Sequence, residues 1–172
     1  PDVSVIETIN PLENTIIPED QTFKDLGYED QTMGLFGENY FSYVFYASPD
    51  QAASQGAYMD LVLSHSDLLD FEQTGVTVIL NDEVVGGLQL TEESPSIERI
   101  NLVPGVLRRG INRLEVISDI VPYFTCYSSD ILSTWVTVSE TSIVHLPVSE
   151  NKLDIGKNIN LRDFPYMFLD SR

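Results

Sequence analysis

Short apolar runs separated by polar turn residues dominate the middle of the chain. Residues 76–80 and 84–90 are two such runs, and Asn81, Asp82 and Glu83 lie between them. Asn and Asp tolerate tight turns, so this pattern predicts a β-hairpin. Two further runs follow, one ending before Pro104 and one from Ile111 to Val116, and both mix apolar with polar positions as half-buried strands do. The stretch therefore predicts four short strands with their turns.

The connection between the last two of these strands is bounded by residues that break regular secondary structure. Pro104 and Gly110 bracket residues 105–109, which contain the apolar pair Val106 and Leu107. We expect a single helical turn here, with this pair pointing inward.

Alternation is also clear in residues 39–47, the most aromatic segment of the chain. Successive side chains of a strand point to opposite faces. One face would then carry Phe41, Tyr43 and Phe45, and the other Tyr40, Ser42, Val44 and Tyr46. We expect the Phe-containing face to pack in the core and Tyr40 and Tyr46 to lie outside. The alternative is that these tyrosines stack on a glycan.

Further strands are predicted at residues 28–33, 58–64, 135–138 and 142–147. Met59, Leu61 and Leu63 would form the buried side of the second of these. Residues 48–56 are rich in Pro, Asp, Gln, Ala, Ser and Gly and predict a loop. Roughly ten strands with no sustained helical period predict an all-β sandwich rather than an α/β fold.

The chain divides into three parts by composition. Prolines 11 and 18 exclude a helix in residues 1–21, so this segment is a linker or an edge strand laid along the body. We favour a loosely attached N-terminal arm. Residues 22–160 would form the β-sandwich, with a last strand or loop at 153–160. Residues 161–172 would form an exit segment towards a following domain.

Charge narrows the function classes. The chain has 9 Lys plus Arg against 27 Asp plus Glu, a formal net charge of −18. This field repels phosphate backbones and anionic lipids, so we expect no nucleic-acid partner and no membrane-surface binding. The only basic cluster, Arg108, Arg109 and Arg113, is small and fits solvated charges beside a turn. No run of about 18 apolar residues is present, so the segment should not insert into a membrane.

The sequence has no strong catalytic or metal-binding motif. Gly-x-Ser-x-Gly, phosphate-loop and zinc patterns are absent. Cys126 is the single cysteine, so no intrachain disulfide can form. We interpret His65 as an exposed or rim residue and His145 as a strand residue. The expectation is a protein that is not an enzyme and that needs no cofactor or metal. The alternative is a structural calcium ion at an acidic loop such as Glu92-Glu93 or Glu19-Asp20, although the spacing matches no EF-hand.

Several segments, taken in order, resemble a known family. They are Phe23-Lys24-Asp25-Leu26-Gly27-Tyr28, the Ser64-His65-Ser66 region, Leu80-Asn81 at a strand end, the Gly-x-Asn-x-Leu motif at 110–114, the Thr141-Ser142 region and Phe164-Pro165-Tyr166-Met167-Phe168. Together they resemble the periplasmic regulatory subunit of bacterial cellulose synthase.

The resemblance implies a jelly-roll β-sandwich of the carbohydrate-binding-module type. It also implies a non-catalytic polysaccharide-binding role, in which the domain holds or guides a β-glucan chain. The implied partner is a membrane-embedded glycosyltransferase subunit. The implied location is periplasmic or otherwise extracytoplasmic, with membrane anchoring through a region outside this chain.

The long aromatic connection at residues 118–134 supplies the candidate sugar-binding residues, because long loops on a β scaffold often carry binding groups. Sugars offer apolar ring faces and hydroxyl edges, so a site needs an aromatic platform beside hydrogen-bonding side chains. The candidates are Tyr123, Tyr127, Trp135, Asp130 and Asp119. Trp135 is the only tryptophan and starts a predicted strand, and a tryptophan in such a position is more often a core residue than a sugar platform.

Two other functions stay open from the sequence. The first is a structural or assembly domain that makes protein–protein contacts without binding sugar, with exposed tyrosines in the interface. The second is an enzyme acting on polysaccharide, which would require two carboxylates about 5 to 10 Å apart across a cleft. A concave face without such a pair would count against this enzyme.

Overall fold

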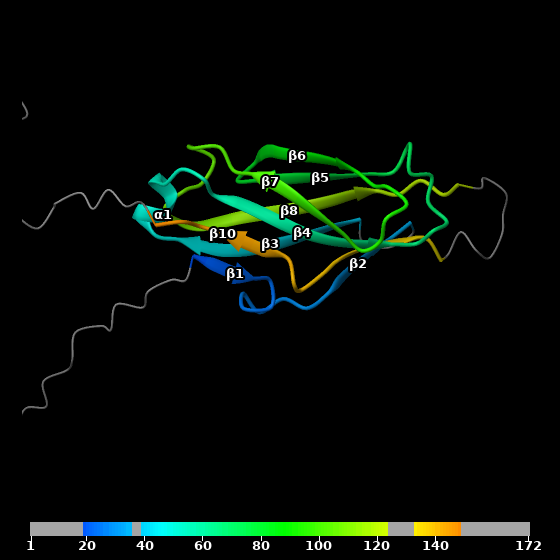
Figure 1. The fold of residues 1–172 in the computed structure, drawn as a ribbon, viewed down its shortest axis with the longest axis horizontal. Helices are drawn as coiled ribbons and strands as arrows, with labels where there is room; N and C mark the ends of the chain where they lie inside the picture. Colours follow the sequence, from blue (N-terminus) through cyan, green and yellow to red (C-terminus); the bar gives the residue numbers. More distant parts are fainter. Residues whose placement is uncertain (1–18, 36–38, 124–132, 149–172) are drawn as a thin grey trace, which may run out of the picture.

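The computed structural model describes residues 19–35, 39–123 and 133–148, and they form two antiparallel β-sheets packed face to face (Figure 1). The larger sheet contains six strands: β1 (Asp20–Thr22), β2 (Gln31–Gly34), β4 (Tyr58–His65), β7 (Ser96–Asn101), β9 (Trp135–Val138) and β10 (Ile143–His145). The smaller sheet contains four: β3 (Tyr40–Ala47), β5 (Gly75–Leu80), β6 (Glu83–Gln89) and β8 (Gly110–Asp119). The predicted jelly-roll sandwich is confirmed as an all-β sandwich.

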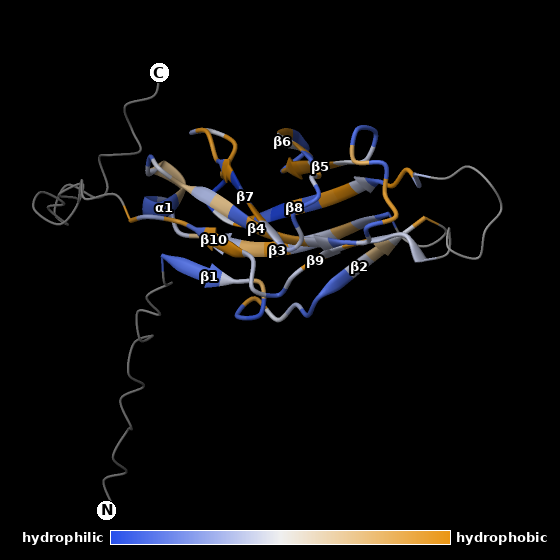
Figure 2. Ribbon diagram, turned by 45° about the vertical axis from the view of Figure 1, so that its right-hand side comes forward, coloured by the Kyte–Doolittle hydropathy of each residue, from blue (hydrophilic) through white to orange (hydrophobic). Residues whose placement is uncertain are grey.

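The order of the strands in each sheet shows which strands lie at an edge. The larger sheet follows β1-β10-β4-β9-β2, with β7 on the other side of β4. The smaller sheet follows β3-β8-β5-β6. The short edge strand β1 is hydrophilic along its length (Figure 2), as expected for a strand with water on one side.

The core lies between the sheets and is built by side-chain alternation. In β4, Met59, Leu61 and Leu63 are fully buried, as predicted. In β3, Tyr43 and Phe45 are buried and Phe41 packs against the core, whereas Tyr40 and Tyr46 are 52% and 50% exposed. The predicted assignment of the two faces of β3 is therefore confirmed.

The predicted hairpin is present as β5 and β6, with Leu80 opposite Glu83. Asn81 and Asp82 both have positive φ, 52° and 73°. Two successive positive φ values define a type I′ turn, whose twist matches that of the flanking strands. The Asn81-Asp82 pair, from which the hairpin was predicted, therefore occupies the two central positions of the turn.

The predicted helical turn at residues 105–109 is wrong. A β-turn closes here instead, with the Val106 N–H donating to the Val103 carbonyl at 3.3 Å. Pro104 sits at its second position and Gly105, with φ +98°, at its third, which is the residue pattern of a type II turn. Val106 and Leu107 are nevertheless buried, as expected.

The predicted loop at residues 48–56 contains a short helix, α1 (Pro49–Ala53). Ser48 and Gln51 form a reciprocal capping box at its start, and Pro49 occupies the first turn. Gln51 is buried, and its Nε2 donates to the Leu146 carbonyl at 3.1 Å. The capping signal was present in the sequence, but loop-type composition masked it.

His65 is also a correction, because its side chain is buried with only 4% exposed. It continues the inward face of β4, two residues after Leu63, and its ring packs edge-on against Phe71 with centroids 5.1 Å apart. Strand periodicity thus overrides the polarity of the residue. His145 lies in β10, as predicted.

Some expectations concern residues outside the described ranges. The exit segment 161–172, the possible strand at 153–160 and Cys126 all lie there, as do residues 1–18 of the arm. The strand expected at 28–33 is observed at Gln31–Gly34, and the one expected at 142–147 at Ile143–His145. The three-part division of the chain stays a prediction.

Candidate carbohydrate-binding site

Three connections meet at one end of the sandwich, on the right of Figure 1: residues 66–74, 90–95 and 120–123. Backbone hydrogen bonds hold the first and third together. The Tyr123 N–H donates to the Leu68 carbonyl at 2.9 Å, and the Asp70 N–H donates to the Val121 carbonyl at 2.8 Å. This pairing fixes Tyr123 beside the 66–74 loop.

A groove of about 980 Å³ opens between these connections, and we call it the end groove. Its walls combine aromatic, acidic and amide side chains. The lining residues are Asp67, Leu69, Asp70, Phe71, Glu72, Gln89, Leu90, Thr91, Glu92 and Tyr123. Tyr123 is 65% exposed, so much of its side chain is open to a ligand.

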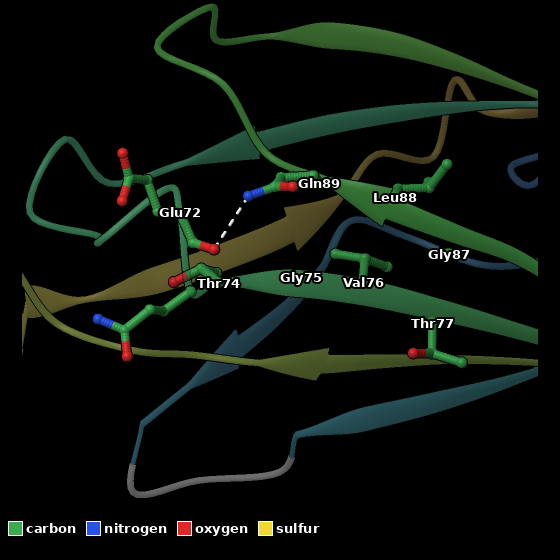
Figure 3. A pocket seen from close by; sticks show the side chains of 9 residues that line it. Glu72, Thr74, Gly75, Val76, Thr77, Gly87, Leu88 and Gln89 are labelled. Carbon is green, nitrogen blue, oxygen red and sulfur yellow. Dashed lines mark hydrogen bonds between the residues drawn. The ribbon is translucent and has the colours of Figure 1, made fainter.

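A second depression of about 360 Å³ runs over the β5–β6 hairpin, and we call it the face groove (Figure 3). It is lined by residues 72–77 and 87–89. Gly87 lies opposite Thr77, and a Cβ atom added to Gly87 would meet no atom within 4 Å. Backbone alone therefore forms part of the floor, which leaves room for a flat molecule.

The two grooves adjoin, because Glu72 and Gln89 line both. The Gln89 Nε2 donates to the carbonyls of Phe71 at 2.9 Å and Glu72 at 3.0 Å, the latter drawn in Figure 3. Asp70 accepts hydrogen bonds from the Glu72 N–H and the Gln73 side chain. Gln89 and Asp70 thus hold the shape of the 70–73 loop from both sides.

The structure brings two of the predicted site residues to this region. Tyr123 lines the end groove. Asp119 is the exposed last residue of β8, and its register partner Gly75 lines the face groove.

The other three predicted residues are not part of the grooves as described. Trp135 is half-buried, and because Val136 and Val138 point into the core, Trp135 lies on the outer face of the larger sheet. Its carbonyl accepts from the Ser66 N–H at 3.0 Å, so its backbone borders the same end of the sandwich. Tyr127 and Asp130 lie outside the described residues.

Sequence reasoning missed Phe71, Gln89 and Gly87. The Gly86-Gly87 pair inside an apolar strand was a usable signal, since glycine in a strand often marks a close approach of another group to the backbone. Phe71 and Gln89 carry no such signal, because their importance depends on loops that meet only in the folded chain.

Neither a metal site nor a membrane-spanning helix is found in the part of the chain that the structure describes. No group of three His, Cys, Asp or Glu side chains in ranges 19–35, 39–123 and 133–148 is arranged to hold a metal ion. Within the same ranges, no helix has the length and apolar character needed to cross a membrane.

The fold and the grooves define a small β-sandwich of the jelly-roll class, with an open site at its loop end. Residues 18–150 match the family model described as "Cellulose synthase BcsB, first CBM domain". This match covers more than half of the chain, so the protein belongs to that family of carbohydrate-binding modules of a cellulose synthase subunit. The predicted family is thereby confirmed.

Solved structures show more distant likeness. Dimeric latent PorU from Porphyromonas gingivalis matches 68% of this chain with 12% identity and a TM-score of 0.44, and the chain spans only 12% of that protein. The carbohydrate-binding module CBM36, solved in complex with calcium and xylotriose, matches 72% of this chain with 14% identity and a TM-score of 0.39, and 96% of that module is covered. No curated protein matches the chain.

Proposed function

We propose that this domain is a non-catalytic polysaccharide-binding module that holds or guides a β-glucan chain in the end groove and the face groove. One observation carries the proposal. The exposed ring of Tyr123 stands at a groove that continues, through Glu72 and Gln89, onto a strip floored by glycine backbone. The family membership supports a β-glucan as the class of ligand.

The chemistry of the lining suits a sugar. Pyranose rings have apolar faces that stack on aromatic side chains, and Tyr123 and Phe71 supply such surfaces. Hydroxyl groups at the ring edges need acceptors and donors, which Asp67, Thr91 and Glu92 can provide. An elongated ligand is favoured because the two grooves follow one another along the surface.

The partner and the location follow from the family and are part of the proposal. A cellulose synthase subunit works beside the glycosyltransferase that extends the glucan, so we propose a membrane-embedded glycosyltransferase subunit as partner. The domain would lie on the periplasmic or extracytoplasmic side, with any anchor provided by a region outside this chain. The bound ligand would then be the glucan that this partner delivers.

Titration of soluble cello-oligosaccharides tests the proposal. Measured by calorimetry, the wild type should show saturable binding. Tyr123→Ala should bind about tenfold more weakly, because an aromatic stacking surface is removed. Tyr46→Ala is the matched control, since Tyr46 is a similarly exposed tyrosine of β3 that pairs with Ile111 at the opposite end of the sandwich and lines neither groove. Equal affinity in the wild type and Tyr123→Ala would overturn the assignment of the site.

The grooves contain carboxylates, so hydrolysis has to be tested as well. Asp67, Glu72 and Glu92 are exposed, whereas a general acid of a glycosidase is held in an apolar pocket that keeps it protonated. We therefore expect no new reducing ends after prolonged incubation with cello-oligosaccharides. Release of shorter products that stops in Glu92→Gln would establish an enzyme instead.

An assembly role is the second candidate, and residues at the other end of the sandwich favour it. The outer face of the smaller sheet exposes Tyr46 opposite Ile111, at 50% and 73%, with Val44 beside them at 44%. Apolar side chains grouped on one face often mark a protein interface. If a second copy binds this face, the sedimentation coefficient should rise with concentration in the wild type but not in Ile111→Thr.

A further inference from the structure

We infer that the grooves select glycans by charge: they accept a neutral β-glucan chain and reject the same chain once it carries carboxylates. This inference rests on the proposed function, and it identifies Asp67, Glu72 and Glu92 as the residues that determine the selectivity.

The lining of the two grooves carries acidic side chains and no basic ones. Four residues of the end groove have ionisable acidic side chains, namely Asp67, Asp70, Glu72 and Glu92, and no Lys or Arg lines either groove. Asp119 adds a fifth carboxylate at the border of the face groove, opposite Gly75. A ligand along both grooves therefore meets one sign of charge from end to end.

Local partners do not neutralise these carboxylates. Asp70 accepts two hydrogen bonds within its loop. Among the described residues, by contrast, the carboxylates of Asp67, Glu72 and Glu92 have neither an ion pair nor a hydrogen bond, and all three residues are exposed. Their charge is therefore available to a ligand in the groove.

The basic side chains of the described ranges lie elsewhere. Lys24 is paired with Glu140, and Arg99 with Asp60. Arg108, Arg109 and Arg113 gather at the opposite end of the sandwich, where an Arg108 guanidinium N–H donates to the Asn81 carbonyl.

The length of β5 separates this basic end from the groove end, a span of roughly 17 Å for five residue steps. The Debye length at physiological salt is only about 8 Å. The arginines therefore cannot compensate the groove carboxylates. A uronate chain would bring its own negative charges within a few ångströms of them, and this repulsion is not offset by any groove cation.

The experiment compares cellohexaose with its C6-oxidised form, which has the same length and linkage but carries carboxylates. By calorimetry at low salt, we expect the wild type to bind the neutral hexamer at least roughly tenfold more tightly. In the triple variant Asp67→Asn, Glu72→Gln, Glu92→Gln, the affinities for the two hexamers should differ by no more than about threefold. The wild type should show the same reduced difference in about 0.5 M salt. The three substitutions keep side-chain size, and circular dichroism checks the fold.

The control must remove the same amount of charge elsewhere. Glu29→Gln, Asp82→Asn and Glu83→Gln neutralise three exposed carboxylates outside both grooves. We expect this variant to keep the wild-type discrimination.

Equal binding of both hexamers by the wild type would overturn the inference while leaving the proposed function intact. Equal narrowing in the remote control would also overturn it, because the net charge would then act without the groove. Failure of the neutral hexamer to bind would overturn the proposed function itself.

Discussion

Asn81 and Asn112 form a side-chain hydrogen bond inside the protein, with the Asn81 Nδ2 donating to the Asn112 Oδ1 at 2.8 Å. Both residues are buried, at 5% and 0% exposure. Asn81 follows β5 and begins the hairpin turn, whereas Asn112 lies near the start of β8. These are the two asparagines of the Leu-Asn and Gly-x-Asn-x-Leu motifs, so the motifs mark a structural connection rather than a sugar-binding site.

The pair is part of a wider network that ties the 103–110 connection to the sheet. Asn112 accepts from the Arg108 N–H at 2.8 Å and donates to the carbonyls of Arg108 and Gly110. Asn81 donates to the Val106 carbonyl and accepts from the Arg113 N–H. Buried polar groups that are all bonded in this way stabilise one specific arrangement of the chain.

Asn112→Ala should lower the free energy of unfolding by about 2–4 kcal/mol, because it removes the hydrogen bond to the buried Asn81 side chain and three bonds to the part-buried backbone of Arg108 and Gly110. Asn101→Ala, the same change at an exposed position of β7, should stay within about 0.5 kcal/mol of the wild type. Urea denaturation of the two variants measures both values. A neutral Asn112→Ala would show that the network does not stabilise the fold.

Tyr43 and Tyr28 should respond oppositely to removal of their hydroxyl groups. The two rings pack edge to face at 5.0 Å, but the buried Tyr43 hydroxyl has no hydrogen-bond partner among the described residues. The Tyr28 hydroxyl accepts from the Val44 N–H at 2.7 Å. We expect Tyr43→Phe to be neutral or about 1 kcal/mol stabilising and Tyr28→Phe to be about 1 kcal/mol destabilising.

Denaturation midpoints decide this pair of predictions. A clear loss of stability in Tyr43→Phe would mean that the hydroxyl has a partner in solution.

Burial also gives Tyr43 a pH dependence. Desolvation, with a smaller contribution from the neighbouring Tyr28, raises the pKa of the Tyr43 hydroxyl well above that of free tyrosine. The folded state then keeps the proton while the unfolded chain loses it above about pH 10. Stability should therefore fall as the pH rises past that value, and Tyr43→Phe should lose less stability between pH 8 and 11. Parallel curves for the two proteins would contradict the assignment.

The adjacent glycines Gly86 and Gly87 should separate stability from binding. A Cβ on Gly86 would lie 3.1 Å from the Ile100 side chain, so Gly86→Val should cost about 1–3 kcal/mol through overpacking. A Cβ on Gly87 would enter the open face groove, so Gly87→Val should fold normally but bind cellohexaose several-fold more weakly. Thermal melts and calorimetry on both variants measure this contrast. Unchanged affinity in Gly87→Val would exclude the face groove from the site.

The sequence by itself determined the features that depend on neighbours along the chain. The period of two fixed which faces of β3 and β4 are buried, and Asn81-Asp82 specified the hairpin turn, since both signals involve residues a few positions apart. The same periodicity, applied consistently, would have placed His65 in the core. The capping box of Ser48 and Gln51 was also a local sequence pattern that predicts the start of a helix.

Only the tertiary structure decided the site. Phe71, Gln89 and Tyr123 are far apart in sequence and meet because β5, β6 and β8 run side by side and deliver their loops to one end of the sandwich. The same packing places Trp135 on the outer face of the other sheet and leaves Gly87 uncovered in the face groove. A local pattern reports which way a side chain points, whereas a groove depends on which distant loops the strand order brings together.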